Sequence, residues 1–290
     1  VWIDISPFIG IVVLQFVAGI MVQKHFDKKK TDFVTGLFGR YVSPSVVDNL
    51  IKGDIEATLK GHTQEVSILF SDLRGFTTLS EELGAKDTSR LLNAYFDAMI
   101  PVVFKHKGTL DKLMGDAIMA FFGAPVYFPD HSIKAAEASL DMLIALKNLR
   151  LPDVRGMNRL NLGIGINTGT VTIGNLGSNQ FMDYTIIGDA VNLASRLEGL
   201  NKFYGTNIIA GEAAVSGLGG KFLLRELDIV KVRGKENFVT IFEVAGYTNN
   251  SDARLVESLA IFNAALYAYR NRNWERCIKK HFSSKRNKPN

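Results

Sequence analysis

The sequence predicts an α+β domain built on one sheet, and the order of its local patterns indicates this. A strand pattern at 65–73 is followed by a helical pattern at 87–106 and by two short apolar runs. A second helical pattern, from about 132 to 149, precedes the next strand region, which gives the order βαββαβ. This order is typical of a ferredoxin-like sheet with helices on one face, and later patterns add extra αβ elements.

The first strand and the first helix are indicated by the spacing of their apolar residues. In "EVSILFSDL", Val66, Ile68 and Phe70 alternate with smaller residues, which is the period of a strand. The helix is marked by apolar residues at helical spacing, which are Leu91, Leu92, Tyr95, Phe96, Met99 and Val103.

Two hairpins are predicted. The first is "GTLDKLMGDAIMAFFG", where two apolar runs flank Gly115 and Asp116, a strong signal for a two-residue turn. The second is "LNLGIGINTGTVTIGNL" at 160–176. The elements expected after it are a helix from 188 to 201, a short strand around 208 and two long strands at 222–232 and 238–245.

The amino-acid composition excludes several classes of function. The chain has 290 residues, of which 47% are apolar, so it can bury the core of one large domain or two small ones. Its single cysteine, Cys277, excludes an internal disulfide framework and a cysteine-based zinc site. The net charge of +5 comes partly from basic ends without interleaved aromatic residues, so no nucleic-acid partner is expected.

The N-terminal residues differ in kind from the rest. Residues 8–22 are apolar except for Gln15, and lysines follow them. We therefore expect a transmembrane segment at 1–23, the last of a longer receptor, with the following residues in the cytoplasm. A buried helix and a signal peptide remain the alternatives. The other expected parts are a connector at 24–63, a catalytic domain at 64–247 and a helical tail at 248–290.

Two aspartates are candidates for a shared cation site. Asp72 ends the first strand, and the turn around Gly75 offers consecutive backbone N–H groups that can hold phosphate oxygens. Asp116 lies in the first hairpin turn, which should neighbour the end of the first strand. Two carboxylates that face each other repel unless a cation or a proton lies between them, and a magnesium ion with phosphate oxygens satisfies this.

A third candidate motif is "DYTIIGDAVNLASRLE". A strand ending at Ile187 turns at Gly188 into a helix that carries Asn192 and Arg196 four residues apart, hence on one face. A guanidinium is a planar cationic fork suited to phosphate. Such a pair on a helix is otherwise often only a solvated face.

Together, "FSDLRGF", "GTLDKLMGD" and "DYTIIGDAVNLASRLE" resemble the class III nucleotidyl cyclase catalytic domain over residues 65–246. The resemblance implies a homodimer with active sites at the subunit interface. Each site would convert a nucleoside triphosphate into its 3′,5′-cyclic monophosphate and pyrophosphate with two Mg²⁺ or Mn²⁺ ions.

The resemblance also implies roles for individual residues. Asp72, Asp116 and the backbone carbonyl of Leu73 match the metal ligands. Asn192 would orient the ribose, and Arg196 would meet the charge that develops at the α-phosphate. The phosphates would be held by Leu73, Arg74, Gly75, Phe76 and Thr77, and the terminal ones by Lys235, with Arg233 as the alternative.

Two further positions bear on the base. In the family, the positions of Lys112 and Thr185 meet the purine. A lysine only donates hydrogen bonds, so it suits the N1 acceptor of adenine and opposes the N1–H of guanine. ATP is therefore the expected substrate and cyclic AMP the expected product. A branch of the family with threonine at the second position resembles the bicarbonate-responsive cyclases.

Three alternatives remain open at this point. A catalytically silent nucleotide-sensing module is one, although such modules lose metal aspartates or the asparagine–arginine pair. A palm-type nucleotidyl enzyme would need a different acidic turn from "MGDAI". A guanylate cyclase is the third, and Lys112 argues against it.

Overall fold

The computed structural model describes residues 6–39, 47, 51, 61–152, 154, 156–178, 181–231, 238–275 and 278. Its α-helices are α1 (Ser6–Phe38), α4 (Phe76–Lys105), α5 (His131–Asn148), α6 (Asp189–Tyr204), α7 (Glu212–Ser216) and α8 (Ala253–Arg270). Its strands are β1 (His62–Arg74), β2 (Thr109–Met114), β3 (Ala117–Phe122), β4 (Asn161–Ser178), β5 (Phe181–Ile187), β6 (Ile208–Gly211), β7 (Phe222–Lys231) and β8 (Phe238–Tyr247). Short 3₁₀ turns lie at Met157–Arg159 and Thr248–Asn250.

The strands form one mixed sheet in the order β2-β3-β1-β4-β6-β8-β7, and β5 pairs with β4 beside this path. The first four strands in that order are antiparallel neighbours, which is the ferredoxin-like arrangement that the βαββαβ pattern predicts. Strand β6 adds in parallel to β4, and the β7–β8 pair extends the same edge. The predicted α+β class is confirmed.

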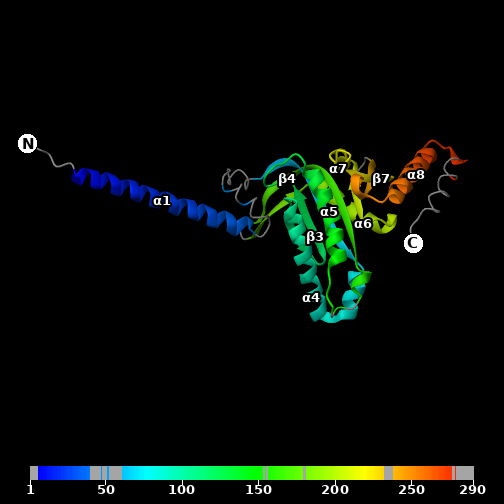
Figure 1. Cartoon of the computed structure of the whole chain (residues 1–290), viewed down its shortest axis with the longest axis horizontal. Helices are drawn as coiled ribbons and strands as arrows, with labels where there is room; N and C mark the ends of the chain where they lie inside the picture. Colours follow the sequence, from blue (N-terminus) through cyan, green and yellow to red (C-terminus); the bar gives the residue numbers. More distant parts are fainter. Residues whose placement is uncertain are drawn as a thin grey trace, which may run out of the picture.

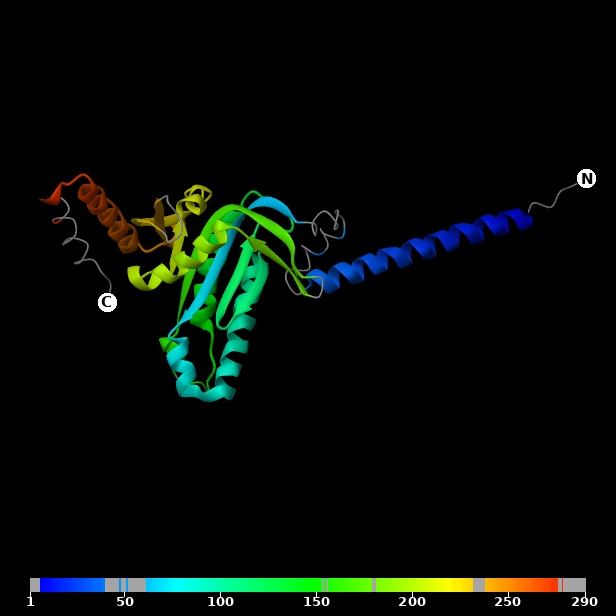
Figure 2. The ribbon, with the colours of Figure 1, turned by 180° about the vertical axis from the view of Figure 1, so that it is seen from behind.

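Helices cover both faces of this sheet, whereas the sequence pattern predicted helices on one face only. Side chains of α4 and α5 pack with Leu69 and Leu73 of β1, and Ala190 and Ala194 of α6 pack with Ile68, which points to the other face. Figure 1 shows α5 in front of the sheet, and Figure 2 shows α6 across the opposite face. The βαββ pattern places α4 and α5, but it carries no information about the helix that follows β5.

The prediction of a second hairpin at 160–176 is wrong. These residues form one continuous strand, β4, whose antiparallel partner is β5. A Cβ at Gly165 would lie 2.3 Å from the carbonyl oxygen of Ala194, and one at Gly169 would lie 2.8 Å from the Cβ of Ala190. These glycines therefore serve the close approach of α6, and they do not mark a turn.

The long helix α1 extends away from the sheet, at the left of Figure 1. Its side chains from Leu14 to Phe26 are exposed. Among the residues that the structure describes, no helix combines the length and the apolar character needed to cross a membrane. The apolar run at 8–22 has fewer than the ~20 residues that a span requires. The predicted transmembrane segment at 1–23 is therefore not confirmed, and the location that depended on it stays a prediction.

The C-terminal helix α8 packs on β7, at the end of the sheet away from α1 (Figure 1). The guanidinium of Arg225 lies 4.8 Å from the ring centre of Phe262, and Arg270 pairs with Glu226. A turn follows at 271–273. The rest of the predicted helical tail lies mostly outside the described residues.

We expect Gly165→Ala to destabilise the domain by about 2–3 kcal/mol, because the added methyl group would meet the backbone of α6 and overpack the interface. Gly199→Ala on the exposed side of the same helix is the matched control, since nothing lies within 4 Å of its Cβ. There alanine should stabilise the helix by up to ~1 kcal/mol. Urea unfolding of the two variants measures both effects, and equal midpoints would contradict the packing argument.

Candidate active site

The register of the sheet brings Asp72 and Asp116 together. Strand β1 pairs with β3 so that Ser71 lies opposite Ile118, which sets Asp72 beside the β2–β3 turn that contains Asp116. The pKa of Asp116 is raised to about 6, mainly by partial burial and secondly by contact with the Asp72 carboxylate. Backbone N–H groups of Asp116 itself and of Leu73 donate to this carboxylate and partly offset the shift.

This pair fits a divalent metal. Carboxylate and carbonyl oxygens are the donors that Mg²⁺ and Mn²⁺ prefer, and a cation between the two aspartates would remove their repulsion. Among the described residues, no three His, Cys, Asp or Glu side chains gather closely enough to make another candidate centre. Substrate phosphate oxygens and water would have to complete the coordination.

The turn after β1 has the conformation that its glycine permits. Gly75 has φ 81°, in the left-handed region, and caps the N-terminus of α4. A Cβ there would lie 3.1 Å from the carbonyl oxygen of Arg159, so both the angle and the space require glycine. Leu73 is buried, Phe76 packs against the core and Thr77 is exposed. Of these residues, Phe76 and Thr77 could therefore offer a ligand the N–H groups at the start of α4.

The side chain of Arg74 points elsewhere. Its Nη2 donates to the carbonyl oxygen of Thr206 at 2.6 Å, and its charge interacts with Glu198 and Asp72. Burial lowers the pKa of this guanidinium. Burial and the Asp72 charge in turn raise the pKa of Glu198. Arg74 thus tethers β1 to the end of α6, a role that the sequence reading missed.

Lys112 and Thr185 lie side by side, as the expected purine contact requires. The Nζ of Lys112 is 3.3 Å from the Oγ1 of Thr185, although the two residues are 73 positions apart. Asp111 completes the group, because the hydroxyl of Thr185 donates to its Oδ2 at 2.7 Å. The sequence reading missed Asp111. No local signal marks it, because alternation within a strand sends neighbouring side chains such as Asp111 and Lys112 to opposite faces.

Asn192 and Arg196 lie on the outer side of α6. The buried residues of this helix face the sheet, and they are Ala190, Leu193, Ala194, Leu197 and Asn201. Asn192 and Arg196 are both exposed. Since successive residues turn by ~100° around a helix, these two side chains point away from the sheet surface that carries the aspartates. Lys235 and Arg233 lie outside the described residues.

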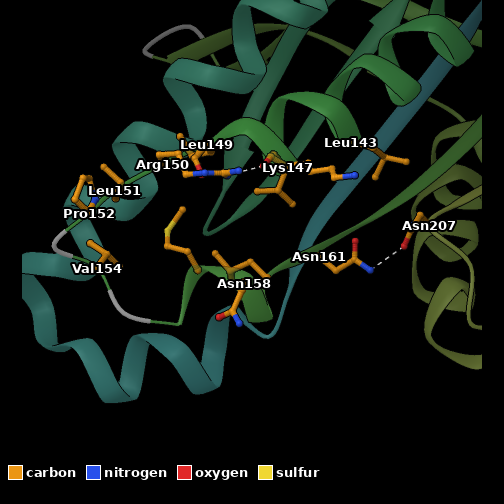
Figure 3. A pocket seen from close by; sticks show the side chains of 13 residues that line it. Leu143, Lys147, Leu149, Arg150, Leu151, Pro152, Val154, Asn158, Asn161 and Asn207 are labelled. Carbon is orange, nitrogen blue, oxygen red and sulfur yellow. Dashed lines mark hydrogen bonds between the residues drawn. The ribbon is translucent and has the colours of Figure 1, made fainter. Parts of the chain in front are cut away.

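Two hollows in the described part of the domain lie away from these residues. A cavity of about 640 Å³ lies between the C-terminal end of α5 and the start of β4, with Leu143, Arg150 and Asn161 in its wall (Figure 3). A second hollow of about 460 Å³ lies near the start of α6. None of the predicted site residues lines either one. Both aspartates are partly buried at the end of β1 and in the β2–β3 turn.

We expect Asp116→Asn to stabilise the metal-free protein at pH 8 by about 1 kcal/mol, a value reduced for the half-exposed position. Because the pKa rises from 3.8 to about 6 on folding, the native state binds this proton more tightly than the unfolded chain. Stability is therefore lost as the pH rises from 3.8 through 6, and asparagine avoids this loss. Urea unfolding at pH 8 and at pH 3.5 measures the difference, which should vanish at the lower pH.

Asp87→Asn is the control, since Asp87 lies on α4 in an exposed ion pair with Arg90 and should shift stability little at either pH. Adding Mn²⁺ should stabilise the parent protein more than the Asp116→Asn variant, because the cation replaces the missing proton. A variant that is no more stable at pH 8 would show that the two carboxylates do not repel each other.

Comparison with known proteins shows which family has this sequence and fold. Residues 59–244 match the family model described as the adenylate and guanylate cyclase catalytic domain. The chain is 37% identical over 216 residues to "Adenylate cyclase" of Anabaena cylindrica and 34% identical over 212 residues to "Adenylate cyclase 1" of Rhizobium meliloti (strain 1021). These alignments cover 73% and 72% of this chain. The chain spans only 42% and 32% of the length of the two relatives.

Two solved structures share the fold at similar identity. The guanylyl cyclase Cya2 is 35% identical with a TM-score of 0.60, and the match covers 66% of this chain and 97% of that one. The adenylyl cyclase CyaB from P. aeruginosa is 34% identical with a TM-score of 0.59, and the match covers 67% and 98%. The chain belongs to the family of adenylate and guanylate cyclase catalytic domains.

Proposed function

We propose that this domain is an adenylate cyclase, which converts ATP into 3′,5′-cyclic AMP and pyrophosphate. The observation that carries the proposal is that the fold brings Asp72 against Asp116 and Lys112 against Thr185. The relatives named above are described as adenylate cyclases, which supports this choice. The Cya2 neighbour is a guanylyl cyclase, so the fold alone does not select the base.

The aspartates would hold the metal ions and, through them, the triphosphate. Asp72, Asp116 and the carbonyl oxygen of Leu73 would bind two Mg²⁺ or Mn²⁺ ions. When bound, these ions supply Lewis acidity that lowers the pKa of the ribose 3′-hydroxyl and offsets phosphate charge. The N–H groups at the start of α4, next to Gly75, would direct the phosphates, because a helix N-terminus attracts anions.

The base would be read by Lys112 and Thr185. The ammonium group of Lys112 would donate to N1 of adenine, and the oxygen of Thr185 would accept from the adenine amino group. Guanine presents the reverse pattern at these two positions. Lys112 would then face the N1–H donor of guanine, which leaves two donors unpaired.

A second copy of the chain would complete the site. Asn192 and Arg196 are exposed on the side of α6 away from the sheet, so in a two-fold dimer they can face the aspartates of the partner. There Asn192 would orient the ribose, and the fork of Arg196 would stabilise the charge developing at the α-phosphate during in-line attack. Such electrostatic help is typically worth ~3 kcal/mol per group. Lys235 is proposed for the terminal phosphates from the motif alone.

Retention of both aspartates and of the asparagine–arginine pair argues against a silent nucleotide-sensing module. Attachment to a membrane through residues 1–23 is not part of this proposal. The activity is assigned to the domain, since the chain covers less than half of the relatives that it matches.

The direct test is product analysis of the purified chain with ATP and with GTP in separate reactions, each supplied with Mn²⁺. We expect cyclic AMP and pyrophosphate from ATP, and a much slower reaction with GTP. Asp72→Ala and Asp116→Ala should reduce turnover to background, because each removes a metal ligand. Asp87→Ala, at an exposed position of α4 that is not one of the proposed site residues, should keep the parent rate. Absence of cyclic nucleotide from the folded chain would refute the proposal.

The interface is tested by complementation between two inactive variants. One carries Asp72→Ala and Asp116→Ala, and the other carries Asn192→Ala and Arg196→Ala. Random pairing of equal amounts should restore about a quarter of the parent activity, because half of the dimers are mixed and each has one intact site. If the mixture stays as inactive as its components, the site does not lie between subunits.

A further inference from the structure

We propose that Asp111 is a positioning residue that sets the choice of base, because it accepts the hydrogen bond of the Thr185 hydroxyl and so leaves Thr185 able only to accept from the nucleotide. This inference rests on the proposed function, since it concerns the same nucleotide site. It assigns a role to a residue for which neither the motifs nor the overall fold gives one.

The geometry of the group is specific. The hydroxyl of Thr185 donates to Asp111 Oδ2 at 2.7 Å. The Nζ of Lys112 lies 2.9 Å from Asp111 Oδ1, close enough for an ion pair, although the geometry is not that of a hydrogen bond. Lys112 also donates to the Oγ1 of Thr185 at 3.3 Å. The side chain of Asp111 has no exposed surface, whereas that of Lys112 is 39% exposed.

An irregularity in the sheet creates this arrangement. The pairing of β2 with β3 shifts register between Leu110 and Lys112, so Asp111 is the extra residue of a bulge. Bulges re-aim side chains and are common next to active sites. Here the bulge directs the carboxylate of Asp111 toward β5, where the backbone N–H of Ile186 also donates to it.

The hydrogen bonds within this group determine which donors and acceptors of Thr185 and Lys112 remain for a nucleotide. A threonine hydroxyl has one proton and two lone pairs, and an ammonium group has three protons. Among the contacts of the described residues, Thr185 uses its proton on Asp111 and one lone pair on Lys112. One lone pair of Thr185 therefore remains. Lys112 directs one proton at Thr185 and contacts Asp111 as an ion pair, so at least one of its protons remains for a ligand.

The site thus presents a donor on Lys112 and an acceptor on Thr185, next to each other. Adenine offers the complement, with an acceptor at N1 and a donor at its amino group. Guanine offers a donor at N1 and an acceptor at O6, so both of its groups would meet like partners. A site built to pair one pattern rejects the other strongly, because the mismatched polar groups stay unpaired.

The charge of Asp111 is what fixes the direction of the hydroxyl. A carboxylate only accepts, so Thr185 must donate to it. Burial raises the pKa of Asp111, while Thr185, Lys112 and the Ile186 N–H all favour its ionised form. Asparagine has nearly the same shape but presents an NH₂ group. Turned toward Thr185, this group would free the hydroxyl proton to donate to O6 of guanine.

The test uses Asp111→Asn in the whole chain, with ATP and GTP as separate probes. Calorimetric binding in Mn²⁺ and kcat/KM for each nucleotide are both measured. We expect the preference for ATP over GTP to fall about tenfold or more in both, equivalent to ~1.4 kcal/mol. In a Thr185→Val background the same change should have little further effect on the ratio, because the two residues act as one unit. Asp87→Asn is the control and should leave the ratio unchanged.

Equal ATP:GTP ratios in the parent and in Asp111→Asn would overturn the inference, as would a full additional loss in the Thr185→Val background. A parent chain that binds ATP in preference to GTP but forms no product would refute the cyclase proposal alone. If thermal unfolding shows that Asp111→Asn does not fold, the comparison becomes Thr185→Ser against Thr185→Val. Serine should keep the ATP preference about tenfold above that of valine, and equal ratios would overturn the inference.

Discussion

The mutual repulsion of Asp72 and Asp116 is the constraint on which the rest of the site depends. Packing of β1 against β3 forces the two carboxylates together, and burial with this contact raises the pKa of Asp116 to about 6. A fold that needed only stability would not keep two acids in contact at the end of a strand. The arrangement is useful when a cation and phosphate oxygens occupy the gap, which is why the pair carries the proposed chemistry.

The placement of α6 separates the two groups of proposed site residues within one chain. Gly165 and Gly169 let the helix lie against β4 at a distance that no side chain would permit. Its apolar stripe is used on the sheet, so Asn192 and Arg196 face outward. In the proposed site, one chain would thus carry the aspartate pair and the Asn192–Arg196 pair on different surfaces. Dimerisation is then a chemical requirement of the proposed reaction, since only a second chain can bring the two pairs together.

In the proposed site, a buried acid would act without touching the nucleotide. Asp111 lies beside Lys112 and accepts the hydrogen bond of the Thr185 hydroxyl. Discrimination between purines would then depend on the ionisation of a residue inside the sheet, in addition to the two side chains that meet the base. The same logic applies to Arg74, whose contact with Thr206 holds β1 to α6 and so keeps Asp72 in place.

The sequence by itself determined the features that follow from local pattern. It gave the βαββαβ order, the hairpin at Gly115, the start of α6 after Gly188, and the positions of Asp72, Asp116, Asn192 and Arg196 within motifs. Tertiary structure decided what depends on approach between distant segments. In the sequence, the glycines of β4 are typical of a turn, but in the structure they make room for α6. The partner of Asp111 is Thr185 of β5, which is 74 positions away in the chain. Periodicity reports which face of an element is apolar. It cannot report which element covers that face or which buried polar groups meet there, because those contacts join residues far apart in the chain.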